Sequence, residues 1–194
     1  AAFLRDCIFV FVAKSFKVRL IYHLHGKGIK EVVSKSRFRG FIYRWAFKNE
    51  AVICLSAKIS SDLNGLLESR PLILPNCLEE REVKKELILD TEYDFIFLSN
   101  LFIYKGVIAF LGALEYCVRE SPGVKALIVG SEADLSEESL LKEIELRNLR
   151  ANCFYAGALY GDVKFDALSS AKVLVYPTMN DAFPLVILEA FSES

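Results

Sequence analysis

The sequence lacks several features that define whole classes of protein. Among its 194 residues, no apolar run approaches the roughly 18 residues that a membrane-spanning helix needs. It has no low-complexity tract, no initiator methionine and no signal peptide with a basic start, an apolar stretch and a cleavage site. We therefore expect neither a membrane span nor a disordered tail, and we expect a fragment of a longer protein.

Three motifs with known chemistry are also missing. The sequence has no G-x-G-x-x-G, which an oxidoreductase that binds dinucleotides would show after its first strand, and no G-x-S-x-G of a hydrolase. It has no C-x-x-C pair, so neither a zinc knuckle nor a redox motif is supported. The five scattered cysteines are predicted to be mostly small buried hydrophobes in a reducing compartment. We predict neither a metal site nor a cofactor.

The residues that are present suit a globular protein with an uneven charge. Hydrophobic residues make up 53% and charged residues 25%, enough to bury a core. Residues 1–50 carry 11 Lys and Arg against 3 Asp and Glu, whereas the remaining residues carry 13 against 22. This basic front predicts an anionic partner such as a phospholipid surface or a pyrophosphate-linked lipid, with a solvated helix face as the equal alternative. Nucleic acid is not expected, because no binding motif accompanies the charge.

Short apolar segments alternate with segments of helical periodicity along the chain. We expect strands at residues 17–23, 51–55, 72–74, 95–98, 124–129, 153–155 and 173–176. We expect helices at residues 1–16, 37–49, 56–67, 106–119, 136–149, 162–170 and from 185 onward. Strands that are apolar throughout imply parallel sheets covered on both faces, and repeated β-α units predict a doubly wound α/β fold.

The charge-rich residues 79–92 predict a connector between two Rossmann-like domains, at residues 1–78 and 93–194. Both domains are expected to be incomplete, because each supplies three or four strands where about five or six per sheet are usual.

Residues 177–190 hold the sharpest candidate site. Pro184 suits the first position of a helix, which leaves the N–H groups of Leu185 and Val186 unpaired and able to attract phosphate. Glu189 follows one turn later and could accept hydrogen bonds from a ribose diol, and Asp181 could accept them from sugar hydroxyls. On spacing alone, a helix cap at Asp181 and a solvated Glu189 remain the simpler interpretation.

This segment resembles the E-x7-E signature of retaining GT-B glycosyltransferases that use nucleotide sugars, glycosyltransferase family 4. Further blocks resemble the same family in order, at residues 97–101 with 105–107, 126–130, 154–157 and 174–178. Residues 21–26, 52–56 and 73–76 more loosely resemble the second half of its acceptor-side domain. The resemblance implies hexosyl transfer from a nucleoside-diphosphate sugar to a glycan or lipid-linked hydroxyl. It also implies a role in the synthesis of bacterial surface polysaccharide. The protein would then lie in the cytoplasm, either free or as a peripheral protein at the inner face of the cytoplasmic membrane.

The resemblance also implies roles for individual residues. Lys105 would neutralise the donor pyrophosphate, Asp181 would hold sugar hydroxyls, and His25 would exchange a proton across the cleft. Glu189 would hold the ribose, and we expect Glu189 and Lys105 to face the same cavity. The remaining nucleotide contacts would come from Asn100, Gly130, Gly157, Phe183, Leu185 and Val186.

Two departures from the family pattern bear on this assignment. The first acid of the signature is Asp181 instead of Glu, and Asn100 stands where many members place an Arg. A pair of histidines, His23 and His25, could alternatively bind metal, although no further ligands cluster with them. A catalytically inactive nucleotide-binding or self-associating α/β fragment is the alternative to an enzyme.

Overall fold

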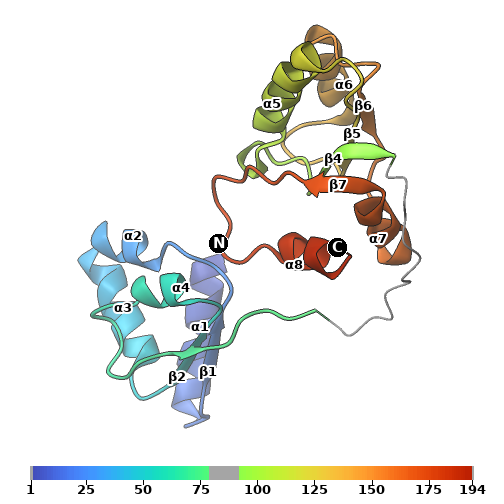
Figure 1. Ribbon diagram of the computed structural model, residues 1–194. Helices are drawn as coiled ribbons and strands as arrows, with labels where there is room; N and C mark the ends of the chain where they lie inside the picture. The colour runs from blue at the N-terminus through green and yellow to red at the C-terminus, as the bar shows by residue number, and fades with distance from the viewer. Residues whose placement is uncertain (1, 79–91, 194) are drawn as a thin grey trace. The chain divides into compact units, whose positions relative to one another are not determined.

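The computed structural model describes residues 2–78 and 92–193, so most of the predicted connector lies outside the described residues. The chain divides into two compact units, Ala1–Asn76 and Cys77–Ser194. Both are α/β units with parallel sheets, as the alternation of strands and helices predicts (Figure 1).

The first unit has a three-stranded parallel sheet in the order β1-β2-β3. Its strands are β1 (Ile21–Leu24), β2 (Ala51–Cys54) and β3 (Leu72–Ile73), and its helices are α1 (Ala2–Ser15), α2 (Ile29–Ser34), α3 (Arg37–Phe47) and α4 (Ala57–Ser61). Serine hydroxyls begin two of these helices: Ser36 accepts a hydrogen bond from the Arg39 N–H, and Ser56 accepts one from the Ile59 N–H.

The second unit has a four-stranded parallel sheet in the order β6-β5-β4-β7. Its strands are β4 (Tyr93–Leu98), β5 (Ala126–Val129), β6 (Cys153–Tyr155) and β7 (Ala171–Leu174). Its helices are the 3-10 turn η1 (Ile103–Lys105), α5 (Val107–Glu120), α6 (Glu137–Leu146), α7 (Gly161–Ser169) and α8 (Leu185–Ser192). Strand order and direction match a doubly wound arrangement.

Side chains from alternate positions of β4 and β5 fill a core on each face of this sheet. Phe97 and Ile128 pack with the buried residues of α5 and α6, whereas Ile96 and Leu127 pack with those of α7. Figure 1 shows α5 and α6 on one side of the sheet and α7 and α8 on the other. The sheet is therefore covered on both faces, and the carboxyl ends of its strands remain for a binding site.

Several predicted elements differ in their bounds from those observed, and one observed helix was not predicted. The contacts of β1, α2, α4 and β7 explain the differences at these elements. β1 begins only at residue 21, because Lys17 adopts a left-handed conformation and Glu50 binds the Leu20 N–H. α2 was not expected; it follows its N-cap Gly28, whose N–H donates to the Asp62 carboxylate at 2.6 Å. The helix predicted for residues 56–67 ends at Ser61. After that residue, the backbone N–H groups donate to carbonyls three positions back instead of four, as in a series of turns.

β7 runs from residue 171 to 174, two residues earlier than predicted, because pairing with β4 sets where it begins. Ala171 lies opposite Tyr93, and the Lys172 ammonium reaches the Asp94 carboxylate at 2.8 Å. Tyr176 consequently lies in the loop that follows, which matters for the site described below.

The prediction that the strands are buried on both faces is right for the centre of the larger sheet. It is wrong for the β7 edge of that sheet and for the smaller sheet. All four residues of β5 are buried, whereas Val173 on β7 is half-exposed and Ile21 on β1 is exposed. β1, β3 and β7 are edge strands of their sheets, which explains their exposure. The prediction for the cysteines is likewise only partly right, since only Cys54 and Cys153 are buried.

Candidate functional site

The loops that follow β4 and β7 join to form one structure at the carboxyl end of the sheet. The Met179 N–H donates to the Tyr104 carbonyl at 2.9 Å, which ties the second loop to the first. Gly106 has a φ of 93°, and a Cβ there would overlap the Pro177 carbonyl. Only glycine therefore allows the two loops to approach this closely.

Lys105 and Asp181 meet at this junction, although 76 positions separate them in the sequence. The Lys105 ammonium lies 2.5 Å from the Asp181 Oδ2, and both side chains are mostly buried, at 18% and 16% exposure. The Tyr176 hydroxyl donates to the same oxygen at 2.7 Å. The ammonium also lies over the rings of Tyr104 and Tyr176, at 5.5 and 5.7 Å from their centroids.

This cluster shifts the pKa of each of its three groups. Burial alone would raise the pKa of the Asp181 carboxyl, but the hydrogen bonds from Lys105 and Tyr176 outweigh it and lower that pKa. Burial opposes the charge of Lys105, yet its contacts with Asp181 and Tyr176 raise its pKa. Burial raises the pKa of Tyr176, so its hydroxyl remains a donor at neutral pH.

These shifts predict how the contribution of the ion pair to stability depends on pH. The pKa of Asp181 is lowered on folding from 3.8, so its contribution is present above pH 3.8 and disappears as the pH falls through the folded pKa. The pKa of Lys105 is raised from 10.5, so its contribution is present below pH 10.5 and disappears above. We expect parent and Asp181→Asn to differ by about 1–3 kcal/mol in the free energy of unfolding near pH 7. Urea unfolding should show this gap shrinking below pH 4; a constant gap from pH 3 to 8 would contradict the assignment.

Glu189 is held by a different partner. It lies on α8, and its Oε1 accepts from the Lys164 ammonium of α7 at 2.8 Å. Lys105 and Glu189 thus contact different partners in this structure. Two pockets are seen in the first unit.

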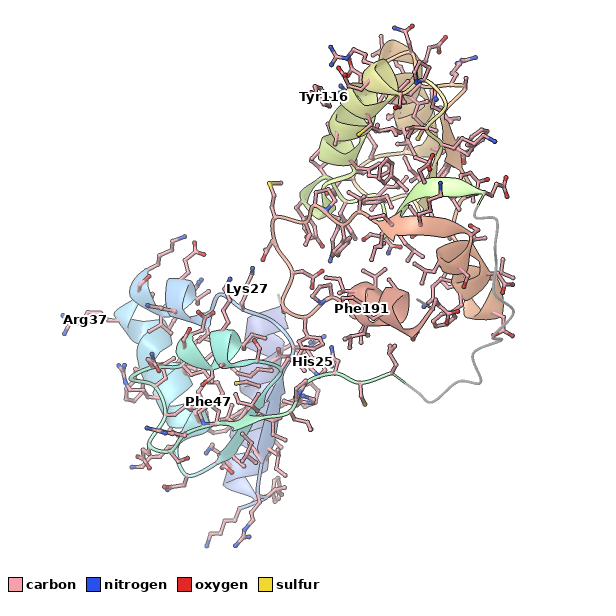
Figure 2. All side chains as sticks on the ribbon, viewed as in Figure 1. His25, Lys27, Arg37, Phe47, Tyr116 and Phe191 are labelled. Atoms are coloured by element: carbon pink, nitrogen blue, oxygen red, sulfur yellow. The ribbon has the colours of Figure 1, made fainter. Side chains whose placement is uncertain are left out.

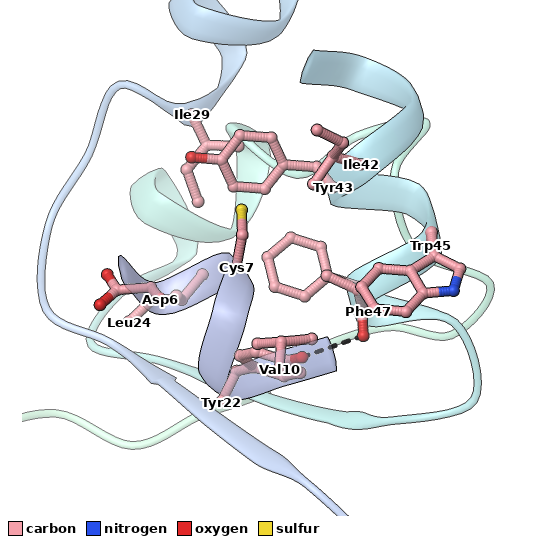
Figure 3. Close-up of a pocket in the computed structure, with 11 residues that line it drawn as sticks. Asp6, Cys7, Val10, Tyr22, Leu24, Ile29, Ile42, Tyr43, Trp45 and Phe47 are labelled. Atoms are coloured by element: carbon pink, nitrogen blue, oxygen red, sulfur yellow. Dashed lines mark hydrogen bonds between the residues drawn. The ribbon is translucent and has the colours of Figure 1, made fainter. Parts of the chain in front are cut away.

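Those pockets differ in character. One, with a volume of about 220 Å³, lies between α1, β1 and α3 and is lined by apolar and aromatic side chains such as Tyr22, Trp45 and Phe47 (Figure 3). The other, of about 440 Å³, is more polar and lies between α4 and β3. None of the residues predicted for the donor site lines either pocket.

The start of α8 has the form expected from the sequence, displaced by one position. Pro184 is the N-cap instead of the first helical residue, and helical hydrogen bonding is first seen where the Ile187 N–H donates to the Pro184 carbonyl. The N–H groups of Leu185 and Val186 belong to the first turn, where a helix leaves its donors unpaired. The Val186 side chain is buried, whereas Phe183 is half-exposed.

Two predicted contact residues have structural explanations of their own. A Cβ at Gly130 would overlap the Ser99 carbonyl, so glycine there lets the loops after β4 and β5 approach each other. Gly157 has a φ of 71° with open space around it, as a turn after a strand requires. Asn100 is exposed on the loop after β4.

His25 belongs to the first unit and follows β1 directly, where it is exposed (Figure 2). Its ring lies 4.2 Å from that of His23, centroid to centroid. Among residues 2–78 and 92–193, no group of three or more His, Cys, Asp or Glu is placed to hold a metal ion. Over the same residues, no helix is long and apolar enough to cross a membrane.

Sequence reasoning missed two residues that contact the predicted site. Tyr176 was assigned to a buried strand, and only the observed register of β7 places its hydroxyl on Asp181. Lys164 sits in a predicted helix, and the Glu189 that it contacts lies 25 positions further along the chain. Helical spacing alone gives no signal for such a contact between two helices.

The parallel sheet and the helices on both of its faces define a Rossmann-like fold, and the polar cluster lies at the edge where such folds usually bind ligands. The chain belongs to the family described as glycosyl transferases group 1, whose sequence profile matches residues 79–193. No curated protein matches the chain significantly.

Solved structures show the same fold at low sequence identity. HepE from Anabaena, in complex with UDP, has a TM-score of 0.73 at 18% identity, over 96% of this chain and 54% of its own. A trehalose-6-phosphate structure from E. coli, bound with UDP-2-fluoro glucose, has a TM-score of 0.73 at 12% identity, over 97% and 54%. TarM from S. aureus, in complex with fondaparinux, alpha-GlcNAc-glycerol and UDP, has a TM-score of 0.71 at 18% identity, over 91% and 35%. The chain thus spans about a third to just over half of these proteins, which are glycosyltransferases of the GT-B type.

Proposed function

We propose that the chain is part of a retaining hexosyltransferase and that its second unit binds the sugar donor. The reaction moves a sugar from a nucleoside-diphosphate sugar to a hydroxyl of a glycan or lipid-linked acceptor, in the synthesis of bacterial surface polysaccharide such as lipopolysaccharide or capsule. The observation that carries the proposal is the contact between Lys105 and Asp181, which the fold brings to the carboxyl end of the sheet. UDP is the first nucleotide to test, because the HepE and TarM structures named above contain it.

The proposed chemistry is mainly electrostatic. Lys105 turns from Asp181 to the diphosphate, and the N–H groups of Leu185 and Val186 add hydrogen bonds at the start of α8. The acceptor oxygen bonds to the anomeric carbon on the face that the diphosphate leaves, and the acceptor proton passes to the departing phosphate oxygen. Asp181 is proposed to hold sugar hydroxyls. A role of His25 in proton transfer rests on the family resemblance alone, and the mechanism needs no metal or cofactor.

The basic front of the chain supports an anionic membrane surface or a phosphorylated lipid as a partner. All three acidic residues of positions 1–50 are already paired with basic residues of the same unit, as Asp6 with Arg5, Glu31 with Lys35 and Glu50 with Lys14. The net positive charge of this segment therefore comes from the remaining Lys and Arg side chains. We propose peripheral association at the inner face of the cytoplasmic membrane on this ground.

A catalytically inactive, self-associating fragment is the second candidate. The observation in its favour is the exposed apolar surface of α1, where Ile8, Phe9 and Phe11 are each more than 60% exposed. A turnover assay with UDP-glucose, run beside a measurement of molecular mass in solution, separates an active enzyme from an inert oligomer.

The proposal is tested by calorimetric titration of the chain with UDP, GDP and ADP. Glu189→Ala should weaken binding of the preferred nucleotide about tenfold, because the ribose loses a charged hydrogen-bond acceptor. Glu138→Ala is the matched control, since Glu138 is an exposed residue of α6 on the same unit. If no nucleotide binds the folded chain, the donor site is disproved; if Glu189→Ala binds normally, Glu189 does not hold the ribose.

A further inference from the structure

A second ion pair lies outside the Lys105 cluster and joins the last two helices of the chain. The Lys164 ammonium on α7 donates to the Glu189 Oε1 on α8 at 2.8 Å. Both side chains are largely removed from solvent, with 22% of Lys164 and 13% of Glu189 exposed. A pair this buried restrains both side chains more than a pair on the surface does.

The two oxygens of the Glu189 carboxylate differ in their surroundings. Oε1 is taken by Lys164, whereas Oε2 has no hydrogen-bond partner among residues 2–78 and 92–193. Within the same residues, the buried side-chain atom that lacks a partner is Nε of Arg147, so Oε2 is not sealed in the interior. The carboxylate therefore has one oxygen bound to Lys164 and a second, not fully buried oxygen that makes no hydrogen bond within the described residues.

Lys164 is itself held in place. Its ammonium lies 4.6 Å from the centroid of the Phe165 ring, a distance typical of a cation–π contact. The helix that carries it packs against the sheet through Ala167 and Leu168, which are both buried. A charge on a rigid element can fix the rotamer of the carboxylate that it binds.

We propose that Lys164 is a positioning residue that holds the Glu189 carboxylate in the orientation needed for the two ribose hydroxyls of the donor nucleotide. This inference rests on the proposed function, because it needs Glu189 at the ribose. Without Lys164, the Glu189 side chain can adopt other rotamers, and a carboxylate that is not held toward the diol accepts its hydrogen bonds less well.

The experiment compares a nucleotide with its analogue that lacks both ribose hydroxyls. The parent chain and Lys164→Met are titrated with UDP and with 2′,3′-dideoxy-UDP, and the ratio of the two affinities is the readout. We expect the parent to prefer UDP about tenfold or more, and Lys164→Met to lose about fivefold or more of that preference. Binding of the dideoxy analogue should hardly change, because it makes no contact with Glu189.

Two further variants separate positioning from a merely structural role. Ser169→Ala removes the hydrogen bond from the Ser169 hydroxyl to the Glu193 carboxylate, which lies between the same two helices but does not touch Glu189. This variant should keep the parental ratio. In the double variant Lys164→Met with Glu189→Gln, the ratio should equal that of Glu189→Gln alone, because Lys164 acts through Glu189. Lys164→Arg, which keeps the charge, should restore part of the preference.

The possible results overturn different claims. If the parent binds neither UDP nor its analogue, the proposed function fails with UDP as donor and the inference falls with it. If the parent prefers UDP and Lys164→Met keeps that preference, the inference alone is wrong. If Lys164→Met weakens both ligands equally, or if Ser169→Ala changes the ratio as much, Lys164 supports the phosphates or the helix packing and does not position Glu189.

Discussion

Lys105→Ala should bind UDP about 10–100-fold more weakly than the parent chain. This range follows from the loss of a charged hydrogen bond to the diphosphate, worth about 1.5–3 kcal/mol. The effect is expected to be large because the Lys105 ammonium is mostly buried and fixed between the Tyr104 and Tyr176 rings, where water screens it less. Calorimetry at constant ionic strength measures it, with Lys142→Ala, an exposed residue of α6, as the control.

Asp181→Asn distinguishes a diphosphate ligand from a purely structural ion pair. If Lys105 serves the diphosphate, Asp181→Asn should keep or improve the affinity for UDP, because the lysine loses a competing anionic partner. The same variant should weaken UDP-glucose relative to UDP, since the sugar loses its acceptor. If Lys105→Ala and Asp181→Asn lower the free energy of unfolding equally and neither changes the affinity for UDP, the ion pair between these residues only holds the two loops together.

Gly106→Ala should lower the free energy of unfolding by about 2–5 kcal/mol. A left-handed conformation costs an alanine about 1–2 kcal/mol, and the overlap of its Cβ with the Pro177 carbonyl adds the cost of forcing two backbones apart. Gly157→Ala is the matched control, because Gly157 is also left-handed but has open space around it. Urea unfolding of both variants tests this prediction; equal losses would show that the approach of the two loops contributes nothing.

The sequence was sufficient to predict those parts of the fold that local chemistry determines. β5 is an unbroken apolar run followed by Gly130, so its place and burial were predictable. The helices after Ser36, Ser56 and Ser136 begin within one residue of their predicted starts, and each of these serines caps its own helix.

Elements that depend on distant partners could not be placed from the sequence. α2 begins where Asp62, 34 positions away, binds the Gly28 N–H, and no local pattern reports that contact. β7 was displaced by two residues because its start depends on pairing with β4.

The same division applies to the site. Lys105 was predicted from the family resemblance, and Asp181 and Glu189 from their places around a predicted helix start as well as from that resemblance. The structure brings Lys105 and Asp181 within hydrogen-bond distance. It places Glu189 beside Lys164 instead, and Tyr176 beside Asp181. Hydropathy treats a tyrosine in an apolar run as core and a lysine on a helix as surface, so both partners were invisible before the helices and loops were assembled.

The Lys105–Asp181 pair has a consequence for what the resting site attracts. Lys105 and Asp181 already neutralise each other. A phosphate ion bound to the Lys105 ammonium would therefore leave the mostly buried Asp181 carboxylate without a partner. A nucleotide sugar can replace both partners, because its diphosphate oxygens can bind the Lys105 ammonium and its sugar hydroxyls can donate to the Asp181 carboxylate. Under the proposed function, we expect the site to prefer a nucleotide sugar over inorganic phosphate, because only the nucleotide sugar replaces both partners of the ion pair.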